Sequence, residues 1–271
     1  MTEVAQRTEL LLPAPAAALG ALLDVPVPDL DGGEGLPLLW HWVYLLDRPA
    51  QADLGPDGHP VRNAVPAPPG PGRRRMFAGG RIRTHGPLRC GEPATRRTTV
   101  LSVRDKQGRS GPLTFVVVGH QVSQGGRVVV DEQQDIGDRD ASGAVSTPEG
   151  GAVVPPADDE WSIDITPTLL FRFSALTYNA HRIHYDRDYV RDVEGYPGLL
   201  THGPLQALAM AEAARGRGFP GDVFEYRLVS PLFDHQGMVV RAVPDAGQVT
   251  TAVRDVHGRW TATGTVRSVP A

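Results

Sequence analysis

Cysteine, positive charge and long apolar runs are scarce in this 271-residue sequence, and each scarcity excludes a class of protein. A single cysteine, Cys90, rules out an internal disulfide and a metal cluster held by thiolates alone. The 27 Lys and Arg residues are outnumbered by 31 Asp and Glu residues, and a net charge of −4 argues against a nucleic-acid partner. No apolar run approaches the roughly 20 residues of a membrane span, and the N-terminus does not resemble a secretory signal. We therefore expect a cytoplasmic protein without a membrane partner.

Proline and glycine, in contrast, are abundant, with 25 and 31 residues that gather in two stretches. Residues 55–75 form a Pro-rich loop that ends in three arginines, and residues 141–159 carry no aromatic side chain and little charge. Such composition is typical of loops and linkers. We interpret the second stretch as a linker at 146–160, which separates an N-terminal unit at 1–145 from a C-terminal unit at 161–271.

The two units repeat one order of elements, in which helix candidates precede strands. In the first unit we predict helices at 14–24 and 36–47, each with a proline near its start. Its predicted strands, rich in Val and Thr, are 96–105, 113–123 and 127–136. The second unit has an almost wholly apolar helix at 203–216, which requires burial on nearly all sides. Its predicted strands are 222–232, 237–245, 248–256 and 259–269.

A short echo between the units supports a duplication. Arg83, Pro87 and Leu88 recur as Arg227, Pro231 and Leu232, each 144 residues further on, since 227 − 83, 231 − 87 and 232 − 88 all give 144. The fold class we predict is α+β, with a helix lying against a curved antiparallel sheet, present twice.

The polar segment "SALTYNAHRIHYD" at 174–186 lies just ahead of the apolar helix. It places two of the nine histidines, His181 and His184, beside Asn179. It is either a polar surface loop or the chemical centre of the protein. A bend around Pro197 separates it from the helix and would hold it near the helix N-terminus.

Three stretches resemble one known family: "RFSALTYNAHRIHYDRDY" (172–189), "EGYPGLLTHGPL" (194–205) and "MFAGGRI" (76–82). They are similar to the MaoC-like enoyl-thioester hydratases and 3-hydroxyacyl-thioester dehydratases, and most of all to the branch that contains mesaconyl-C4-CoA hydratase and the type 2 mitochondrial dehydratases. The resemblance implies a double hot-dog fold, with the catalytic segment in the second unit and a degenerate first unit that shapes the pocket. The implied reaction adds or removes water at the double bond next to a thioester.

The family pattern Asp-x-Asn-Pro-x-His falls on residues 179–184 and implies His184 as acid/base. The position of the family aspartate holds Asn179, which can orient a water molecule but cannot take its proton. At the N-terminus of the apolar helix Pro204 has no N–H, so we expect Gly203 to be the backbone donor to the thioester oxygen. Further substrate contacts are expected from Tyr178, His181, Arg182, His202 and Gly79. Each residue also has a purely structural interpretation. Asn179 would cap a turn, His202 would form hydrogen bonds with the backbone, and residues 76–80 would form a bend.

No cofactor is expected, since coenzyme A or phosphopantetheine would enter as part of an acyl-CoA or acyl-carrier-protein substrate. A metal site is not predicted, because the pair His181 and His184 lacks further ligands. The arginines at 73–75 either bind coenzyme A phosphates or form a solvated charge run. A carboxylate on the substrate would meet Arg172 or Arg182. Hot-dog proteins often pair, so a homodimer is an expectation, although two fused units could already satisfy that need.

Three other functions stay open on the sequence alone. A thioesterase would direct water to the carbonyl carbon and release free thiol. In a non-catalytic acyl-binding subunit, His184→Ala would leave the ligand affinity and any measured turnover unchanged. A dehydratase of carrier-bound intermediates in fatty-acid or polyketide synthesis would differ only in the thiol component of the substrate, which would be a carrier protein instead of coenzyme A.

Overall fold

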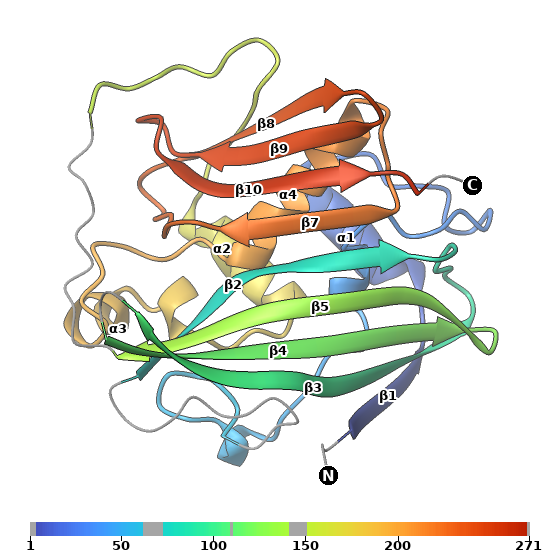
Figure 1. Cartoon of the computed structure of the whole chain (residues 1–271), viewed down its shortest axis with the longest axis horizontal. Coiled ribbons are helices and arrows are strands. Elements are labelled where there is room, and N and C mark those ends of the chain that lie inside the picture. The colour runs from blue at the N-terminus through green and yellow to red at the C-terminus, as the bar shows by residue number, and fades with distance from the viewer. Residues whose placement is uncertain (1–3, 62–72, 109–110, 141–150, 270–271) are drawn as a thin grey trace.

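A single antiparallel sheet of ten strands forms the body of the molecule (Figure 1). The computed structural model describes residues 4–61, 73–108, 111–140 and 151–269. The strand order is β1-β3-β4-β5-β2-β7-β10-β9-β8-β6. The strands are β1 (Val4–Leu10), β2 (Arg73–Thr84), β3 (Pro93–Gly108), β4 (Gly111–Gln124), β5 (Arg127–Asp140), β6 (Trp161–Ile163), β7 (Val223–Leu228), β8 (Met238–Asp245), β9 (Gln248–Arg254) and β10 (Trp260–Arg267).

The sheets of the two units join edge to edge through β2 and β7. Gly79 pairs with Arg227 across this seam, and a bulge lies between Phe77 and Gly79. Gly79 has a φ of +151°, and a Cβ there would lie 2.4 Å from the carbonyl oxygen of Tyr226. Only glycine combines this backbone conformation with such a close approach. The "MFAGG" stretch is thus part of the junction between the two units.

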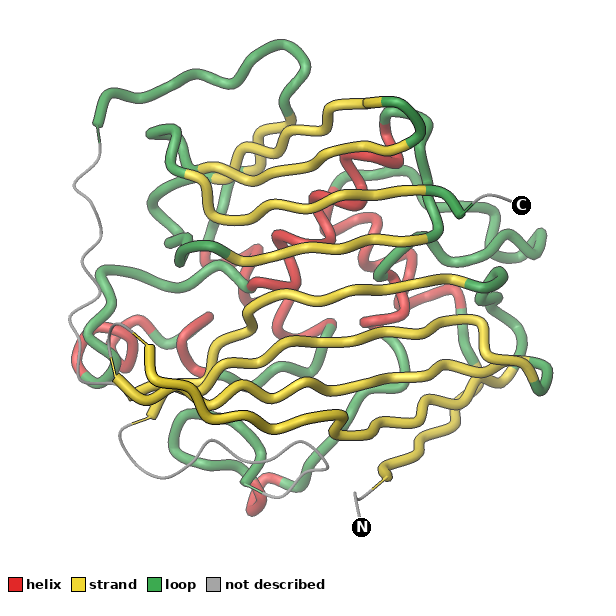
Figure 2. Tube along the Cα trace, in the orientation of Figure 1, coloured by secondary structure: helices red, strands yellow, loops and turns green. Residues whose placement is uncertain are grey.

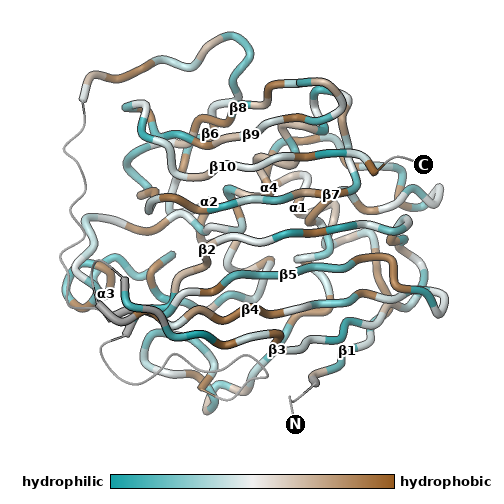
Figure 3. Tube along the Cα trace, in the orientation of Figure 1, coloured by the Kyte–Doolittle hydropathy of each residue, from teal (hydrophilic) through white to brown (hydrophobic). Residues whose placement is uncertain are grey.

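The helices α1 (Pro13–Leu23), α2 (Pro167–Leu176) and α4 (Gly203–Gly216) lie against one face of the sheet (Figure 2). Hydrophobic and hydrophilic residues alternate along the strands (Figure 3), as in β7, where Phe224 is buried and Glu225 exposed. This period of two gives the sheet one apolar face for the helices to cover. In α4 the side chains from Leu205 to Glu212 are all buried, as its apolar circumference requires.

Most predicted elements are confirmed, and one is wrong. The helix at 203–216 is confirmed at both ends, the helix at 14–24 is shifted by one residue, and all seven predicted strands are present. At 36–47 only a single 3-10 turn forms, η1 (Trp40–Val43). Leu39 and Leu45 flank it with left-handed backbone, at φ +69° and +54°, and both are buried in the core. Packing of these leucines thus overrides the helical pattern of the segment.

The proposed linker at 146–160 is described only from residue 151, and residues 151–160 contain neither helix nor strand. The unit boundaries therefore stay predictions. The elements not predicted are β1, β2, β6, α2 and α3 (Arg187–Asp192), together with the 3-10 turns η2 (Gln51–Asp53) and η3 (Arg182–His184). Within the described ranges, no helix is both long and apolar enough for a membrane crossing.

Candidate active site

A cavity of about 670 Å³ opens where the two units meet. The first unit contributes Trp42, His59 and Phe77 to its lining, and the second contributes Asn179 and Pro204. This volume lies within the roughly 300–1,000 Å³ typical of small-molecule sites. Because Pro204 belongs to the first turn of α4, the cavity reaches the helix N-terminus, where free N–H groups and a partial positive charge gather.

The polar segment forms a tight turn between α2 and α3. Tyr178 adopts left-handed backbone at φ +52°, and the Asn179 side-chain oxygen accepts a hydrogen bond of 3.0 Å from the His181 N–H. Asp186 caps α3 by accepting from the Tyr189 N–H at 3.0 Å. Asn179 and Tyr178 both line the cavity. The cap leaves the Asn179 NH₂ group as the donor that can point to a bound molecule.

Four imidazoles form a continuous row beside this turn, which we call the imidazole row. Ring centroids are 4.0 Å apart from His59 to His181, 5.5 Å from His181 to His184 and 3.6 Å from His184 to His202. His202 precedes α4, so the row connects the polar segment to the helix N-terminus. Its far end is a buried 2.8 Å hydrogen bond between His202 Nε2 and Ser174 Oγ.

His184 is held in one tautomer by the backbone. Its Nδ1 donates to the carbonyl oxygen of Leu200 at 2.8 Å, which leaves Nε2 without a proton in the neutral ring. Burial lowers the pKa of His184 to about 4, against the opposing effect of the Leu200 hydrogen bond, and His59 adds to the lowering. The ring is buried and does not line the cavity, whereas Ser174 and Phe173, which contact the neighbouring His202 ring, do line it.

His181 and His202 share this buried, uncharged character. Burial is the main cause that lowers the pKa of each well below the usual histidine value, and the repulsion that a second protonated imidazole nearby would exert adds to it. His202 is fully buried, and its Nδ1 has no hydrogen-bond partner among the described residues. Neither ring lines the cavity, so their predicted contacts with substrate stay predictions.

Of the other predicted residues, Gly203 adjoins the cavity-lining Pro204, and Arg182 belongs to the turn of the polar segment. Gly203 is the first residue of α4, and a Cβ there would lie 2.1 Å from Leu228 Cδ1 and 3.2 Å from Phe77 Cδ1. A side chain at this position would therefore require Leu228 to move. Arg182 pairs with Asp186 at 2.7 Å and lies over the Tyr189 ring at 4.0 Å, which stabilises the turn.

The arginines that end the Pro-rich loop are engaged within the protein. Arg74 pairs with Glu194 at 2.8 Å, and Arg75 pairs with Asp138 at 3.1 Å. The side chain of Arg73 lies outside the described part of the chain. The two described arginines thus serve the scaffold rather than a free charge run.

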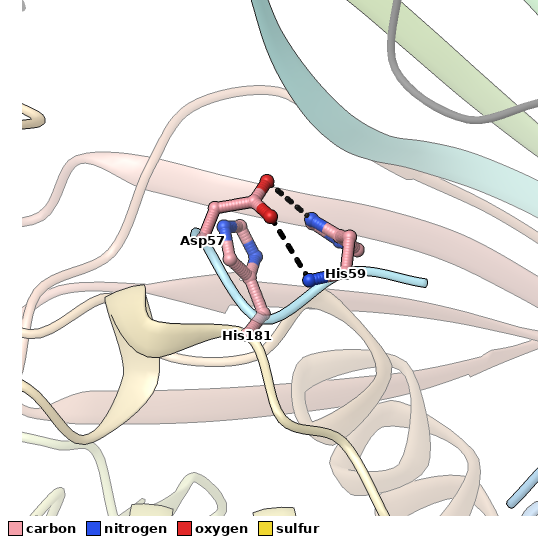
Figure 4. Close-up of side chains that lie close together, drawn as sticks. All are labelled: Asp57, His59 and His181. Carbon is pink, nitrogen blue, oxygen red and sulfur yellow. Dashed lines mark hydrogen bonds and ion pairs between the residues drawn. The ribbon is translucent and has the colours of Figure 1, made fainter. Parts of the chain in front are cut away.

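Sequence reasoning missed a contribution from the Pro-rich loop to this site. Asp57 accepts 2.9 Å and 3.0 Å hydrogen bonds from the Nδ1 and the N–H of His59 (Figure 4). The loop is docked on the polar segment, since the Arg182 N–H donates to the Asp57 carbonyl at 2.9 Å. A Cβ on Gly58 would lie 1.9 Å from the Ala180 carbonyl oxygen. The only signal in the sequence was the turn-forming "DGH".

Asp57, His59 and His181 offer ligand atoms that all lie within 4.8 Å of one another. These residues are the described group that comes nearest to a metal site. The ligand atoms of Asp57 and His59 already bond to each other, and the positive charge of Arg75 acts on His181. The geometry is that of an Asp–His hydrogen-bonded pair, and the expected absence of a metal stays a prediction.

A second polar group lies in the wall contributed by the first unit. His41 Nε2 and Trp42 Nε1 donate to the two oxygens of Glu132, both at 2.8 Å. Burial opposes ionisation of Glu132, but the His41 hydrogen bond and the charges of His41 and His120 outweigh it and lower the pKa to about 2. The cavity is therefore lined by a buried carboxylate as well as by imidazoles.

Comparison with known proteins gives one consistent family. A family model described as hydroxyacyl-thioester dehydratase type 2 matches residues 39–234. Mesaconyl-C(4)-CoA hydratase of Chloroflexus aurantiacus is 43% identical over 258 residues, which cover 93% of this chain and 91% of that protein.

Two solved structures agree on the fold. HtdX of Mycobacterium tuberculosis gives a TM-score of 0.70 at 18% identity and covers 98% of this chain and 100% of its own. A second M. tuberculosis protein, described as a double hot-dog fold, gives a TM-score of 0.59 at 17% identity, with 98% and 94% covered. With the family match, these findings establish that the chain belongs to the type 2 hydroxyacyl-thioester dehydratases, a double hot-dog family of hydro-lyases that add or remove water at acyl thioesters.

Proposed function

We propose that this enzyme hydrates a short unsaturated acyl-CoA whose acyl group carries a free carboxylate, a substrate of the mesaconyl-C4-CoA kind, or dehydrates the product. The observation that carries the proposal is the cavity shared by both units at the N-terminus of α4, in a chain 43% identical to a protein of that name. The cavity volume of about 670 Å³ suits a short acyl group with part of its thioester arm.

The residues divide the reaction among three tasks. The unprotonated Nε2 of His184 exchanges the proton at the α-carbon, a task worth typically about 10² to 10⁴ in rate. The Asn179 NH₂ group orients the water or hydroxyl oxygen. The Gly203 N–H, at the positive end of α4, stabilises the charge that develops on the thioester oxygen. Because the His184 ring does not line the cavity, the proposal includes a side-chain movement in the cavity wall that brings His184 into contact with the substrate.

Arg96 is the residue we propose to receive the second carboxylate. Neither Arg172 nor Arg182 lines the cavity, whereas Arg96 does. Its Nη2 pairs with Asp47 at 2.7 Å, and its Nε is buried without a hydrogen-bond partner among the described residues. A buried donor without a partner is costly, and a carboxylate would satisfy it.

The direct test supplies the purified protein with mesaconyl-CoA and, separately, crotonyl-CoA. We expect loss of enoyl absorbance without release of free thiol, and faster turnover of mesaconyl-CoA. Release of thiol would favour the thioesterase, and binding without turnover would favour the acyl-binding subunit. Preference for the same acyl group on a carrier protein would favour the carrier-bound dehydratase.

Arg96→Gln tests the carboxylate contact, with Arg172→Gln as the matched control because Arg172 is exposed and does not line the cavity. We expect Arg96→Gln to lower kcat/KM for mesaconyl-CoA by roughly tenfold to a hundredfold, because a charged hydrogen bond contributes about 1.5–3 kcal/mol. Crotonyl-CoA lacks the carboxylate and should be much less affected. An equal loss on both substrates, or an equal effect of Arg172→Gln, would contradict the assignment.

The proposal includes no metal and no separate cofactor, since the two proton transfers, one at the α-carbon and one at the oxygen bound to the β-carbon, are assigned to side chains. Dialysis against a chelator should leave turnover unchanged. The cytoplasmic location and the homodimer expected from the sequence stay predictions.

A further inference from the structure

Addition of water to a double bond requires proton transfer at two places. One proton leaves or joins the oxygen, and another joins or leaves the α-carbon. In the proposed function His184 serves the α-carbon, but the amide of Asn179 cannot carry a proton to or from the oxygen. The position that holds a carboxylate in the family pattern therefore leaves one proton transfer without a residue.

His59 satisfies the conditions for that task. It lines the cavity together with Asn179, and its ring is 4.0 Å from that of His181 in the polar segment. Its side chain is 20% exposed, which gives access to a bound molecule, whereas His181, His184 and His202 are buried. It enters the site from the first unit, on a loop docked against Ala180 and Arg182.

Asp57 gives His59 the orientation of an acid/base residue. The carboxylate accepts from Nδ1 at 2.9 Å, so Nδ1 carries a proton and Nε2 is the atom left to exchange one. The same carboxylate also accepts from the His59 N–H at 3.0 Å, which fixes the pair locally. An aspartate that holds Nδ1 stabilises the imidazolium form when the ring gains a proton, as in hydrolase triads.

We propose that His59, positioned by Asp57, is the second acid/base residue of the reaction and replaces the carboxylate that Asn179 lacks. The inference rests on the proposed function.

In dehydration, His184 Nε2 removes the α-proton, and the electron pair of that C–H bond becomes the new double bond. The Cβ–O bond breaks with its electron pair, and the oxygen takes the proton of the His59 imidazolium and leaves as water. Hydration is the reverse, with neutral His59 accepting a proton from water. His184 then releases its extra proton to solvent and His59 takes one up, which restores the starting protonation states.

His41 and His120 also line the cavity, but they belong to the polar group around Glu132 in the first unit. His41 is hydrogen bonded to Glu132 and His120 to Thr98, both on strands of that unit. His59 is the described imidazole of the cavity that is in direct contact with the polar segment. We therefore assign the task to His59 rather than to them.

His59→Gln in the full chain tests the proposal, with hydration of mesaconyl-CoA as the assay. We expect kcat to fall by about 100-fold or more while KM changes by less than about threefold. The matched control is His85→Gln, because His85 forms an equivalent 2.8 Å pair with Asp131 on a different, exposed part of the molecule. That control should keep the kcat of the wild type.

Three further measurements separate the proposal from a structural role. Added imidazole should restore part of the kcat of His59→Ala but not that of His184→Gln. Asp57→Asn, which is nearly isosteric, should lower kcat. The double variant, Asp57→Asn with His59→Gln, should be no slower than His59→Gln alone, because Asp57 acts only through His59. Far-UV circular dichroism and Tm identify a variant that does not fold, in which case Asp57→Asn provides the test.

Several outcomes would overturn the proposal. One is a kcat for His59→Gln within twofold of the wild type, and another is additive losses in the double variant. Loss of wild-type activity to a chelator with recovery on adding Zn²⁺ would assign Asp57, His59 and His181 to a metal instead. A wild type that turns over no acyl-CoA would reject the proposed function and the proposal with it, whereas an active wild type with an active His59→Gln rejects only this inference.

Discussion

Burial decides the chemistry of individual histidines in this site. His184 is surrounded by protein, and its pKa is lowered to about 4, so the ring stays neutral at physiological pH. A neutral ring with its Nδ1 hydrogen bonded to a carbonyl presents a free Nε2, which is the form that a base requires. His59 differs because it is partly exposed and has a carboxylate partner. The site thus contains two imidazoles in environments suited to opposite roles in proton transfer.

The low pKa of His184 makes stability depend on pH. The folded pKa lies below the unfolded value of about 6.5, so the unfolded chain binds the proton first as pH falls. Titration of His184 therefore leaves the free energy of unfolding unchanged above about pH 6.5. Between about pH 6.5 and pH 4 it lowers the free energy of unfolding progressively, by roughly 3 kcal/mol in total.

Urea denaturation at several pH values measures this loss. Between pH 6 and 5, His184→Gln should show a smaller fall in the free energy of unfolding than the wild type, by up to about 1.4 kcal/mol per pH unit. The slope should not vanish, because the pKa values of His181 and His202 are also lowered. Identical slopes in both proteins would contradict the burial argument.

The sequence predicted the residues of the polar segment better than it predicted their contacts. The motif located Asn179 and His184 beside the start of α4, and the structure brings them there. It could not assign His59, because residue 59 lies 122 positions before residue 181 and only the fold brings the two rings together. Nor could it show that Arg182 would pair with Asp186 within the turn.

At the scale of elements, the loop around Gly58 determines how the first unit reaches the site. Its φ of +89° and the absence of a Cβ let it contact the Ala180 carbonyl, and this contact brings His59 to the cavity. A side chain at residue 58 would push the loop away from the polar segment. The loop thus positions His59 at the cavity although its backbone is irregular.

Gly58→Ala and Gly33→Ala form a matched pair that tests this role. Both positions have positive φ, at +89° and +88°, but a Cβ on Gly33 meets nothing within 4 Å. Each variant should lose about 1–2 kcal/mol through backbone strain, measured by thermal or urea unfolding. Gly58→Ala should lose more and should also lose most of its hydratase activity. Equal stability and activity of the two variants would show that the contact with Ala180 is unimportant.

Elements with strong periodicity were predictable, and elements that depend on packing were not. The helix at 203–216 and the strands from β3 to β5 and β7 to β10 follow their patterns. The segment 36–47 has a helical composition, but burial of Leu39 and Leu45 with left-handed backbone prevents a helix. Short elements such as β6 carry too few residues for a periodic signal.

At the scale of the whole molecule, the duplication produces one sheet and one site. The seam strands β2 and β7 contain the echoed residues Arg83 and Arg227, as a duplicated unit predicts. Because the seam is continuous, a loop of the first unit and the polar segment of the second face the same cavity. A buried hydrogen bond of 2.7 Å from Trp40 to Glu212 further joins the units. The first unit therefore contributes polar side chains to the cavity as well as strands to the sheet.

The kcat/KM of His184→Gln with mesaconyl-CoA, compared with the wild type, tests the central claim most directly. If hydration takes place at the imidazole row, the variant should lose about 10² to 10⁴ in kcat/KM while its far-UV circular dichroism stays that of the wild type. A well-folded His184→Gln protein that hydrates the substrate at the wild-type rate would contradict the account.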